Sequence, residues 1–190
     1  MKQHIGGKMG IIVVTGIPGV GKTTVMKKAA EGMNIEFVTF GTVMIDIAKE
    51  MGLVKDRDEM RKLTLAQQRD LQIQTAEKVG DMENAIVDTH CTIKTPKGYM
   101  PGLPEWVIKK LKPTAIVLVE ADPEEIYNRR ASDTTRSRDP DSKEKIAEHQ
   151  QMNRAVAMAY AAITGATVKI VFNHDGAIDA AVKEAAPVLE

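Results

Sequence analysis

The residues with the clearest chemistry form a glycine-rich run near the start of the chain. Residues 16–23 read Gly-Ile-Pro-Gly-Val-Gly-Lys-Thr and match the pattern G-x-x-x-x-G-K-[ST] at every fixed position. Glycines in such a loop let backbone N–H groups turn inward around a phosphate, and the following helix adds its positive end. Lys22 would reach the β- and γ-phosphates, and the Thr23 hydroxyl would coordinate Mg²⁺. A turn that merely links a strand to a helix is the structural alternative, and the matching flanks favour the phosphate loop.

A carboxylate is predicted to lie beside this loop. Asp88 ends the apolar run 85–87, and a carboxylate at the end of a buried strand can hold a magnesium-bound water. Capping of the next turn is the alternative role for Asp88. The metal role is favoured because the third strand ends beside the phosphate loop in this topology. His90 and Cys91 follow directly, and without further ligands they predict neither a zinc site nor a nucleophilic pair.

Arginines gather later in the chain. Arg129 and Arg130 end a predicted helix, and Arg136 and Arg138 stand two apart in the polar segment after it. Phosphoryl transfer concentrates negative charge on the migrating group, so guanidinium groups around it are expected to stabilise it. Exposed ion pairs with neighbouring aspartates are the alternative. The clustering favours a phosphate clamp, and Arg154 on the next predicted helix is a further candidate.

A second group of polar residues lies in the segment 41–80. Gly41 and Thr42 begin a predicted helix. The Thr42 hydroxyl and the free N–H groups of the first helical turn could hold the base or phosphate of a second nucleotide. Arg57 and Arg61 are four apart and so share a helix face, with Arg69 two turns further on. A solvated face that pairs with adjacent acidic residues is equally compatible with Arg57 and Arg61.

The elements that must position these residues alternate along the chain. Short β-branched runs with little polar alternation predict strands buried on both faces of a parallel sheet, at residues 11–15, 35–39, 84–88, 114–120 and 167–172. Longer segments with a helical period separate them, so a three-layer α/β fold is expected. Asp122 and Pro123 start one helix, which runs to about Ala131, and another begins near Asp141 and ends at Gly165. The second is expected to bury Ile146, Met152, Val156, Ala159 and Ile163.

Composition limits the class of protein. A chain of 190 residues, with 43% apolar and 27% charged residues, is expected to form one folded domain. Lys and Arg number 26, as do Asp and Glu, so no general affinity for nucleic acid is predicted. No apolar run approaches the ~20 residues of a membrane span, and residues 1–9 lack the apolar core of a signal peptide. The single cysteine fits a reducing cytoplasm.

Several unusual strings in order resemble the archaeal-type adenylate kinases over essentially the whole chain from residue 11. Besides residues 16–24, they include Phe40-Gly41-Thr42-Val43-Met44, Asp88-Thr89-His90, Thr92-Ile93-Lys94-Thr95-Pro96-Lys97-Gly98-Tyr99, Pro101-Gly102-Leu103-Pro104 and Met152-Asn153-Arg154. The resemblance implies a P-loop nucleoside-monophosphate-kinase fold with a five-stranded parallel sheet. It also implies Mg²⁺-dependent, reversible conversion of ATP and AMP to two ADP by a homotrimer.

The resemblance assigns parts of the chain to functions. It implies a core at 10–40, 81–131 and 142–190, an AMP-binding insertion at 41–80 and a short lid at 132–141. The residues expected to bind ATP are Gly16, Ile17, Pro18, Gly19, Val20, Gly21, Lys22, Thr23 and Thr24. Those expected to bind AMP are Gly41, Thr42, Arg57 and Arg61, and those expected to be catalytic are Lys22, Arg130, Arg136 and Arg138. Thr23 and, through water, Asp88 are expected to hold Mg²⁺.

The chain also departs from longer adenylate kinases. Those place an Asp-Gly-Phe/Tyr-Pro-Arg string after the third strand, whereas this chain has Asp88-Thr89-His90 without the arginine. Arg57, Arg61 and Arg69 are the candidates to replace its phosphate contact. The lid contains no cysteine, so no structural zinc is expected in it. A kinase with another small acceptor, or an ATP-hydrolysing assembly factor, remains an alternative to be separated by an acceptor assay.

Overall fold

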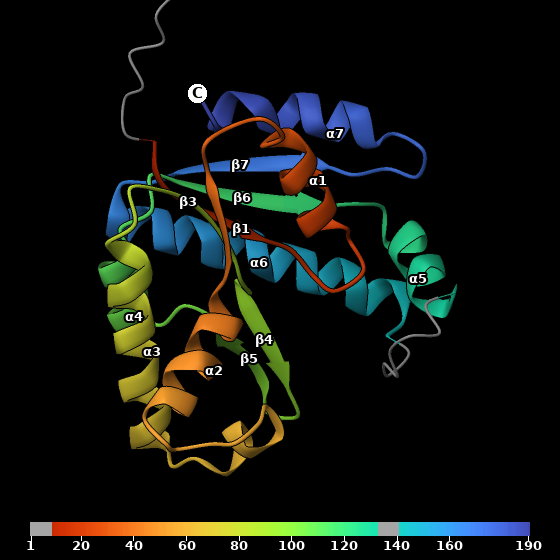
Figure 1. Ribbon diagram of the computed structural model, residues 1–190. Coiled ribbons are helices and arrows are strands. Elements are labelled where there is room, and N and C mark those ends of the chain that lie inside the picture. The colour runs from red at the N-terminus through yellow and green to blue at the C-terminus, as the bar shows by residue number, and fades with distance from the viewer. Residues whose placement is uncertain (1–8, 133–140) are drawn as a thin grey trace, which may run out of the picture.

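Five parallel strands form the central sheet of the computed structural model, which describes residues 9–132 and 141–190 (Figure 1). Their order across the sheet is β2-β3-β1-β6-β7, with every neighbouring pair parallel. The strands are β1 (Gly10–Thr15), β2 (Glu36–Thr39), β3 (Asn84–Asp88), β6 (Ala115–Glu120) and β7 (Thr167–Phe172), and a separate hairpin pairs β4 (Thr92–Thr95) with β5 (Gly98–Pro101). All five strands expected in the sheet are present, which confirms the predicted α/β fold.

Helices cover both faces of the sheet (Figure 1). The α-helices are α1 (Lys22–Ala29), α2 (Phe40–Glu50), α3 (Leu65–Gly80), α4 (Glu105–Leu111), α5 (Pro123–Ser132), α6 (Lys143–Thr164) and α7 (Ile178–Ala185), and 3₁₀ turns occur at η1 (Asp58–Lys62) and η2 (Ala186–Val188). Helices α1 and α7 lie on one side of the sheet, and α3, α4 and α6 lie on the other. None of the helices in these described ranges has the length and apolarity to cross a bilayer.

Strand β1 shows why the strand sequences are apolar throughout. Ile11 and Val13 pack into the core on the side of α3, α4 and α6, while Ile12 and Val14 pack on the side of α1 and α7. Successive residues of a strand point to opposite faces, so a strand covered on both sides needs apolar residues at every position. The end of β1 is thereby held in place at the centre of the molecule.

The segment between β2 and β3 is helical, as the sequence predicts, and it has a small core of its own. Ile47, Ala48, Val54 and Leu71 are buried together, apart from the two clusters that pack against the sheet. Helix α3 begins with a capping box, in which Thr64 Oγ1 accepts from the Gln67 N–H and the Gln67 side chain accepts from the Thr64 N–H. This core lets the helical segment keep its shape while it projects from the sheet (Figure 1).

The start of α6 differs by one residue from the expected one. Ser142, rather than Asp141, is the N-cap, and its Oγ accepts a hydrogen bond from the Lys145 N–H. The Asp141 carboxylate instead contacts Lys94 and Arg130. Helix α5 starts at Pro123, as predicted from Asp122 and Pro123.

The prediction of which α6 residues form the buried face is wrong. Of Ile146, Met152, Val156, Ala159 and Ile163, only Ile146 is buried, and Met152 and Ile163 are exposed. The buried face carries polar side chains instead, among them His149 and Asn153. These side chains are hydrogen-bonded to Thr92 on the β4–β5 hairpin, so their burial is compensated.

The β4–β5 hairpin is an element that the strand prediction does not contain. Its register pairs Lys94 with Tyr99 and Thr95 with Gly98, so Pro96 and Lys97 form a two-residue turn. The alternation of Thr92-Ile93-Lys94-Thr95 before a turn with Gly98 is the signal that would have predicted it. The hairpin is separate from the main sheet and lies between α2 and α6 (Figure 1).

Replacement of Leu71 by alanine should destabilise the protein strongly, because the side chain is fully buried in the small core of the helical segment. We expect Leu71→Ala to lower the free energy of unfolding by about 2–5 kcal/mol. Leu65 lies on the same helix and is 85% exposed, so Leu65→Ala should change it by less than about 0.5 kcal/mol. Urea unfolding followed by circular dichroism measures both. Equal losses in the two variants would contradict the separate core.

Candidate active site

The glycine-rich loop connects β1 directly to α1. Strand β1 ends at Thr15 and helix α1 begins at Lys22, as the strand–loop–helix context of the motif requires. Gly21 is the N-cap of α1 and has a φ of 82°, a left-handed conformation that glycine adopts without strain. The first turn of α1 therefore directs its free N–H groups toward the loop, which suits a phosphate.

The loop is held from one side by the segment that follows β7. Asn173 Nδ2 donates a hydrogen bond of 2.8 Å to the Val20 carbonyl oxygen. A Cβ atom on Gly21 would lie 2.6 Å from the same Asn173 nitrogen, so only glycine fits there. Arg129 donates from Nη2 to the Asn173 carbonyl and from Nε to Asp175. Arg129 thus helps to hold the loop in place. A pocket of about 300 Å³ lies between the loop and the segment after β7, and Arg129 is part of its lining.

Three predicted site residues meet at the end of the loop. The Thr23 hydroxyl donates a hydrogen bond of 2.6 Å to Asp88 Oδ2, and Lys22 Nζ lies 3.1 Å from Asp88 Oδ1. Asp88 is buried at the carboxyl end of β3. Its carboxylate thus contacts the loop rather than the turn that follows it. A hydroxyl and a carboxylate oxygen this close together are the hard oxygen donors that Mg²⁺ prefers, so the pair fits that ion.

Arg130 contacts a different part of the loop from Arg129. Its Nε donates to the Pro18 carbonyl oxygen at 2.8 Å, and its Nη1 lies 3.1 Å from Asp141 Oδ2. The side chain faces a pocket of about 640 Å³ between the loop, the hairpin and the start of α6. The two described arginines of the predicted cluster therefore line different pockets. Arg136 and Arg138 lie outside the described residues.

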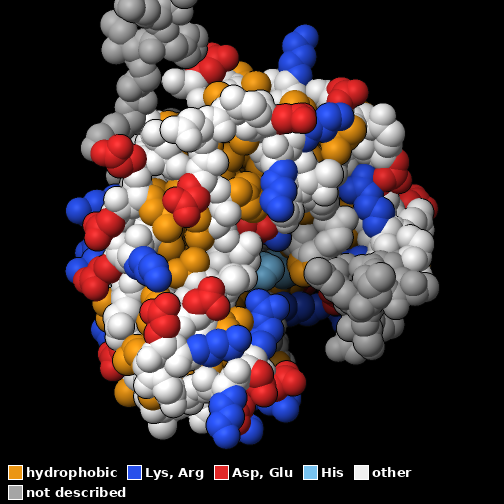
Figure 2. All heavy atoms as spheres, in the orientation of Figure 1, with side chains coloured by type: hydrophobic (Ala, Val, Ile, Leu, Met, Phe, Trp, Pro, Cys, Tyr) orange, Lys and Arg blue, Asp and Glu red, His pale blue; other side chains and the backbone are white. Residues whose placement is uncertain are grey.

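The pocket beside Arg130 has a polar floor. The Thr92 hydroxyl donates to Asn153 Oδ1 at 2.6 Å and accepts from His149 Nε2 at 3.0 Å. Burial lowers the pKa of His149, and the charges of Arg130 and Lys94 lower it further, against opposing effects of Thr92 and Asp141. Burial also lowers the pKa of His90, which Lys22 lowers further. In Figure 2, Lys and Arg side chains surround a histidine where this face of the molecule is hollowed.

The predicted AMP-binding residues are brought together only in part. Arg57 lies beside the first turn of α2, since a Cβ atom added to Gly41 would be 3.9 Å from Arg57 Nη2. Thr42 lies in the same turn. Arg61 lies within the 3₁₀ turn η1, and Arg57 is the residue that precedes it. In a 3₁₀ helix, residues three apart share a face, so the four-residue spacing does not align these two arginines as expected.

Two other arginines have partners of their own. Arg69 lies over the Trp106 ring, 4.5 Å from its centroid, on the side of α3 that faces α4. Arg154 makes a two-pronged ion pair with Glu120, with its Nη2 at 2.6 Å from Oε2 and its Nε at 2.9 Å from Oε1. Glu120 is buried at the carboxyl end of β6. Arg154 therefore neutralises a buried carboxylate beside the site.

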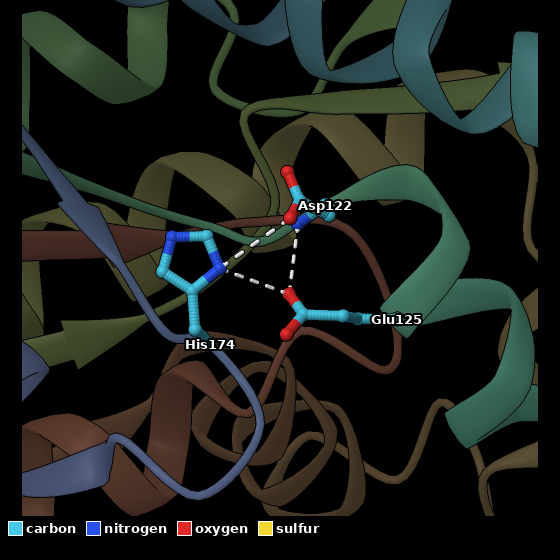
Figure 3. A group of neighbouring side chains, drawn as sticks. All are labelled: Asp122, Glu125 and His174. Atoms are coloured by element: carbon cyan, nitrogen blue, oxygen red, sulfur yellow. Dashed lines mark hydrogen bonds and ion pairs between the residues drawn. The ribbon is translucent and has the colours of Figure 1, made fainter.

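Asp122, Glu125 and His174 form a group at the start of α5 (Figure 3). His174 Nδ1 lies 3.1 Å from Glu125 Oε2 and 3.6 Å from Asp122 Oδ2. Glu125 also accepts hydrogen bonds from the backbone N–H groups of Asp122 and Asp175. The group thus fastens the segment after β7 to α5, and through Asn173 it supports the phosphate loop.

Cys91 is a buried structural residue. Its Sγ lies 3.4 Å from the Asn153 carbonyl oxygen, and burial raises the pKa of the thiol to about 12. A thiol with so high a pKa forms little thiolate at neutral pH and is a poor nucleophile.

Comparison of the sequence with known proteins gives the family. Residues 15–147 match the family described as AAA domain. The adenylate kinase of Methanopyrus kandleri is 55% identical over 180 residues, which cover 92% of this chain and 94% of that protein. The adenylate kinase of Methanothermobacter thermautotrophicus is 53% identical over 96% of this chain and all of that protein. The chain belongs to the adenylate kinase family. The predicted resemblance is thereby confirmed.

Solved structures with the same fold include other small P-loop kinases. The shikimate kinase of Bacteroides thetaiotaomicron aligns with 95% of this adenylate kinase family member and 98% of its own chain, with a TM-score of 0.61 and 15% identity. The shikimate kinase of Aquifex aeolicus aligns with 94% of this chain and 95% of its own, with a TM-score of 0.55 and 21% identity. At these identities the likeness concerns the fold alone.

Sequence reasoning missed part of the site of this kinase. Asn173, which holds the Val20 carbonyl, lies in a short polar segment after β7 that carries no phosphate-binding pattern. The buried network of Thr92, His149 and Asn153 was missed because polar residues in a helical period suggest an exposed face. The sequence does contain a signal for this network. Two polar pairs, His149-Gln150 and Asn153-Arg154, lie one turn apart within a helix that is otherwise rich in Ala and Met.

The lowered pKa of His149 predicts a dependence of stability on pH. Because the folded protein holds the imidazole neutral, the unfolded chain binds more protons once the pH falls below the ordinary value of 6.5. Stability should be fully present above pH 6.5 and should fall toward pH 5, by up to about 1.4 kcal/mol per pH unit for each such histidine. His149→Asn should reduce this loss, leaving the part due to His90. The free energy of unfolding at pH 7.5 and at pH 5.5 is measured for the unmodified protein and for His149→Asn. An identical loss of stability in the two proteins would contradict the role given to His149.

Proposed function

We propose that this protein catalyses the reversible transfer of the terminal phosphoryl group of ATP to AMP, giving two ADP. The observation that carries the proposal is the identity of 55% and 53% to adenylate kinases along almost the entire chain. The grouping of Lys22, Thr23 and Asp88 at the phosphate loop supports the chemistry. The transfer is direct, without a covalent enzyme intermediate, and the carboxylate at the loop, Asp88, is engaged by Lys22 and the Thr23 hydroxyl.

ATP binds along the phosphate loop. Backbone N–H groups of the loop, which Pro18 cannot supply, hold the phosphates together with the first turn of α1, and Lys22 neutralises the charge that develops on the transferred group. Thr23 and, through water, Asp88 hold Mg²⁺, which supplies charge neutralisation and orientation of the phosphates when bound. The pocket of about 300 Å³ beside Asn173 and Arg129 is the place where the chain leaves room for the adenosine part of ATP.

AMP binds beneath the helical insertion, residues 41–80. Gly41 and Thr42 lie in the first turn of α2, and Arg57 lies beside Gly41, so N–H groups and a guanidinium converge there. Arg61 is assigned to the same site from its place in the sequence. The insertion has a small core of its own around Leu71, and it also packs on the sheet-side core through Phe40, Ala76 and Val79.

Arginines complete the site. Arg130 contacts both the phosphate loop and the pocket beside it, which supports a catalytic role. Arg136 and Arg138 are assigned to catalysis from the sequence, within a lid at residues 132–141. The lid excludes water, because an open site would allow hydrolysis of ATP in competition with transfer. The core of the kinase then comprises residues 10–40, 81–131 and 142–190.

The proposed assembly rests on the family resemblance, and the proposed compartment rests on the single cysteine of the chain. We propose a homotrimer in the cytoplasm, and the exposed Met152, Met158 and Ile163 on α6 support an interface on that helix. Light scattering of the purified protein measures the mass of the assembly, and a monomer at every concentration would exclude the trimer.

The reaction is tested by an acceptor assay. ADP should form from ATP plus AMP in the presence of Mg²⁺, and formation should stop when Mg²⁺ is chelated. Shikimate, gluconate, CMP, UMP and GMP serve as competing acceptors in parallel reactions. Faster transfer to one of these, or hydrolysis of ATP that AMP does not affect, would contradict the proposal.

Lys22→Met should lower kcat by at least about 10²–10³-fold, because the charge next to the transferred group is lost. Folding should survive, since Lys22 contributes no part of the apolar core. Lys27, near the end of α1, packs over the Phe37 ring and lies away from the loop, so Lys27→Met is the matched control. Rates within a factor of two for both variants would refute the role of Lys22.

A further inference from the structure

Lys94 of the β4–β5 hairpin lies in the wall of the pocket beside the phosphate loop. Its Nζ is 2.5 Å from Asp141 Oδ1, while Arg130 Nη1 is 3.1 Å from the other oxygen of the same carboxylate. One acidic side chain thus binds two cations that come from separate elements, the hairpin and the end of α5. Burial acts to raise the pKa of Asp141, but Lys94 and Arg130 outweigh it and hold the pKa below its usual value.

The charge of this pocket favours an anion. Among the described residues that line it, Lys94, Arg130 and Lys145 are cationic and Asp141 is the acidic one. His90 and His149 also line it, and their lowered pKa values keep both imidazoles largely neutral. The pocket therefore carries a net positive charge, which an anionic ligand would neutralise.

The pocket is continuous with the phosphate loop. Pro18 of the loop belongs to its lining, and Arg130 is hydrogen-bonded to the Pro18 carbonyl oxygen. His90, also in the lining, lies close enough to Lys22 and Asp88 for their charges to affect its pKa. A phosphate chain that extends from the loop would thus enter a space that Lys94 faces.

The ion pair between Lys94 and Asp141 is of the kind that a phosphate can replace. The Lys94 side chain is 38% exposed and that of Asp141 is 25% exposed, so water weakens their attraction. Phosphate oxygens carry more negative charge than one carboxylate and form strong charge-assisted hydrogen bonds with ammonium and guanidinium groups. Exchange of the carboxylate for a phosphate is therefore favourable at both cations.

We propose that Lys94 is a catalytic residue that contacts the phosphate chain of the bound nucleotides, and that Asp141 is an internal counterion which phosphate displaces. The inference rests on the proposed function and deepens it. Lys94 then supplies, from the hairpin, the cation that longer adenylate kinases carry on an arginine after the third strand.

The test compares three variants of the full chain. Lys94→Met should weaken binding of ADP and of inorganic tripolyphosphate about tenfold in calorimetry and should lower kcat/KM for ATP plus AMP about 10²-fold. Lys94→Arg should restore most of both. Asp141→Asn removes the competing carboxylate and should tighten binding of both probes about two- to tenfold. Lys97, exposed in the turn of the same hairpin and absent from the pocket lining, gives the matched control Lys97→Met, which should stay within twofold of the unmodified protein.

The variants separate phosphate binding from a merely structural ion pair. If the pair with Asp141 only fastens the hairpin, Lys94→Met and Asp141→Asn break the same contact and should weaken binding alike, which would overturn the proposal. Equal behaviour of Lys94→Met and Lys97→Met would also overturn it. The unmodified protein serves as the reference for the reaction. Loss of tripolyphosphate binding in Lys94→Met, without ADP formation by the unmodified protein, would support Lys94 as a phosphate ligand and refute the proposed function instead.

Discussion

A site built to hold several phosphates collects positive charge, and in the empty protein that charge must be balanced from within. Two carboxylates perform this task. Asp88 binds Lys22 and the Thr23 hydroxyl at the phosphate loop, and Asp141 binds Lys94 and Arg130 in the adjoining pocket. Without them, like charges on the loop, the hairpin and α5 would repel one another in a region partly shielded from water. The arrangement of the site depends on this balance.

The two carboxylates differ in how firmly they are placed. Asp88 is buried at the end of a central strand, so its position is set by the pairing of β3 with β1 and β2. Asp141 precedes α6 and is partly exposed, so it is held mainly by its two cations. A firmly placed carboxylate suits a metal-binding role, in which the same oxygen atoms are used with and without nucleotide. A loosely placed one suits displacement.

Rigid support reaches the loop from three directions. Arg130 binds the Pro18 carbonyl, Asn173 binds the Val20 carbonyl, and the Cys91 N–H donates to the Thr15 hydroxyl at the end of β1. These contacts come from segments distant in the chain, which meet because the carboxyl ends of parallel strands share one edge of the sheet. The helical insertion has a core of its own and also packs on the sheet-side core through Phe40, Ala76 and Val79. The molecule thus combines a phosphate loop held by distant segments with a helical insertion that has a small core of its own.

The sequence by itself determined the features that depend on local pattern. The phosphate loop, the five sheet strands and the start of α5 are encoded in contiguous residues, and each is present where its pattern predicts it. The tertiary structure alone decided which side chains meet. It divided Arg129 from Arg130, buried His149 and Asn153 in place of Met152 and Ile163, and brought Lys94 to Asp141 across 47 positions of the chain. The physical reason is that contacts between distant segments depend on packing and charge balance in three dimensions, which a periodic pattern along the chain does not contain.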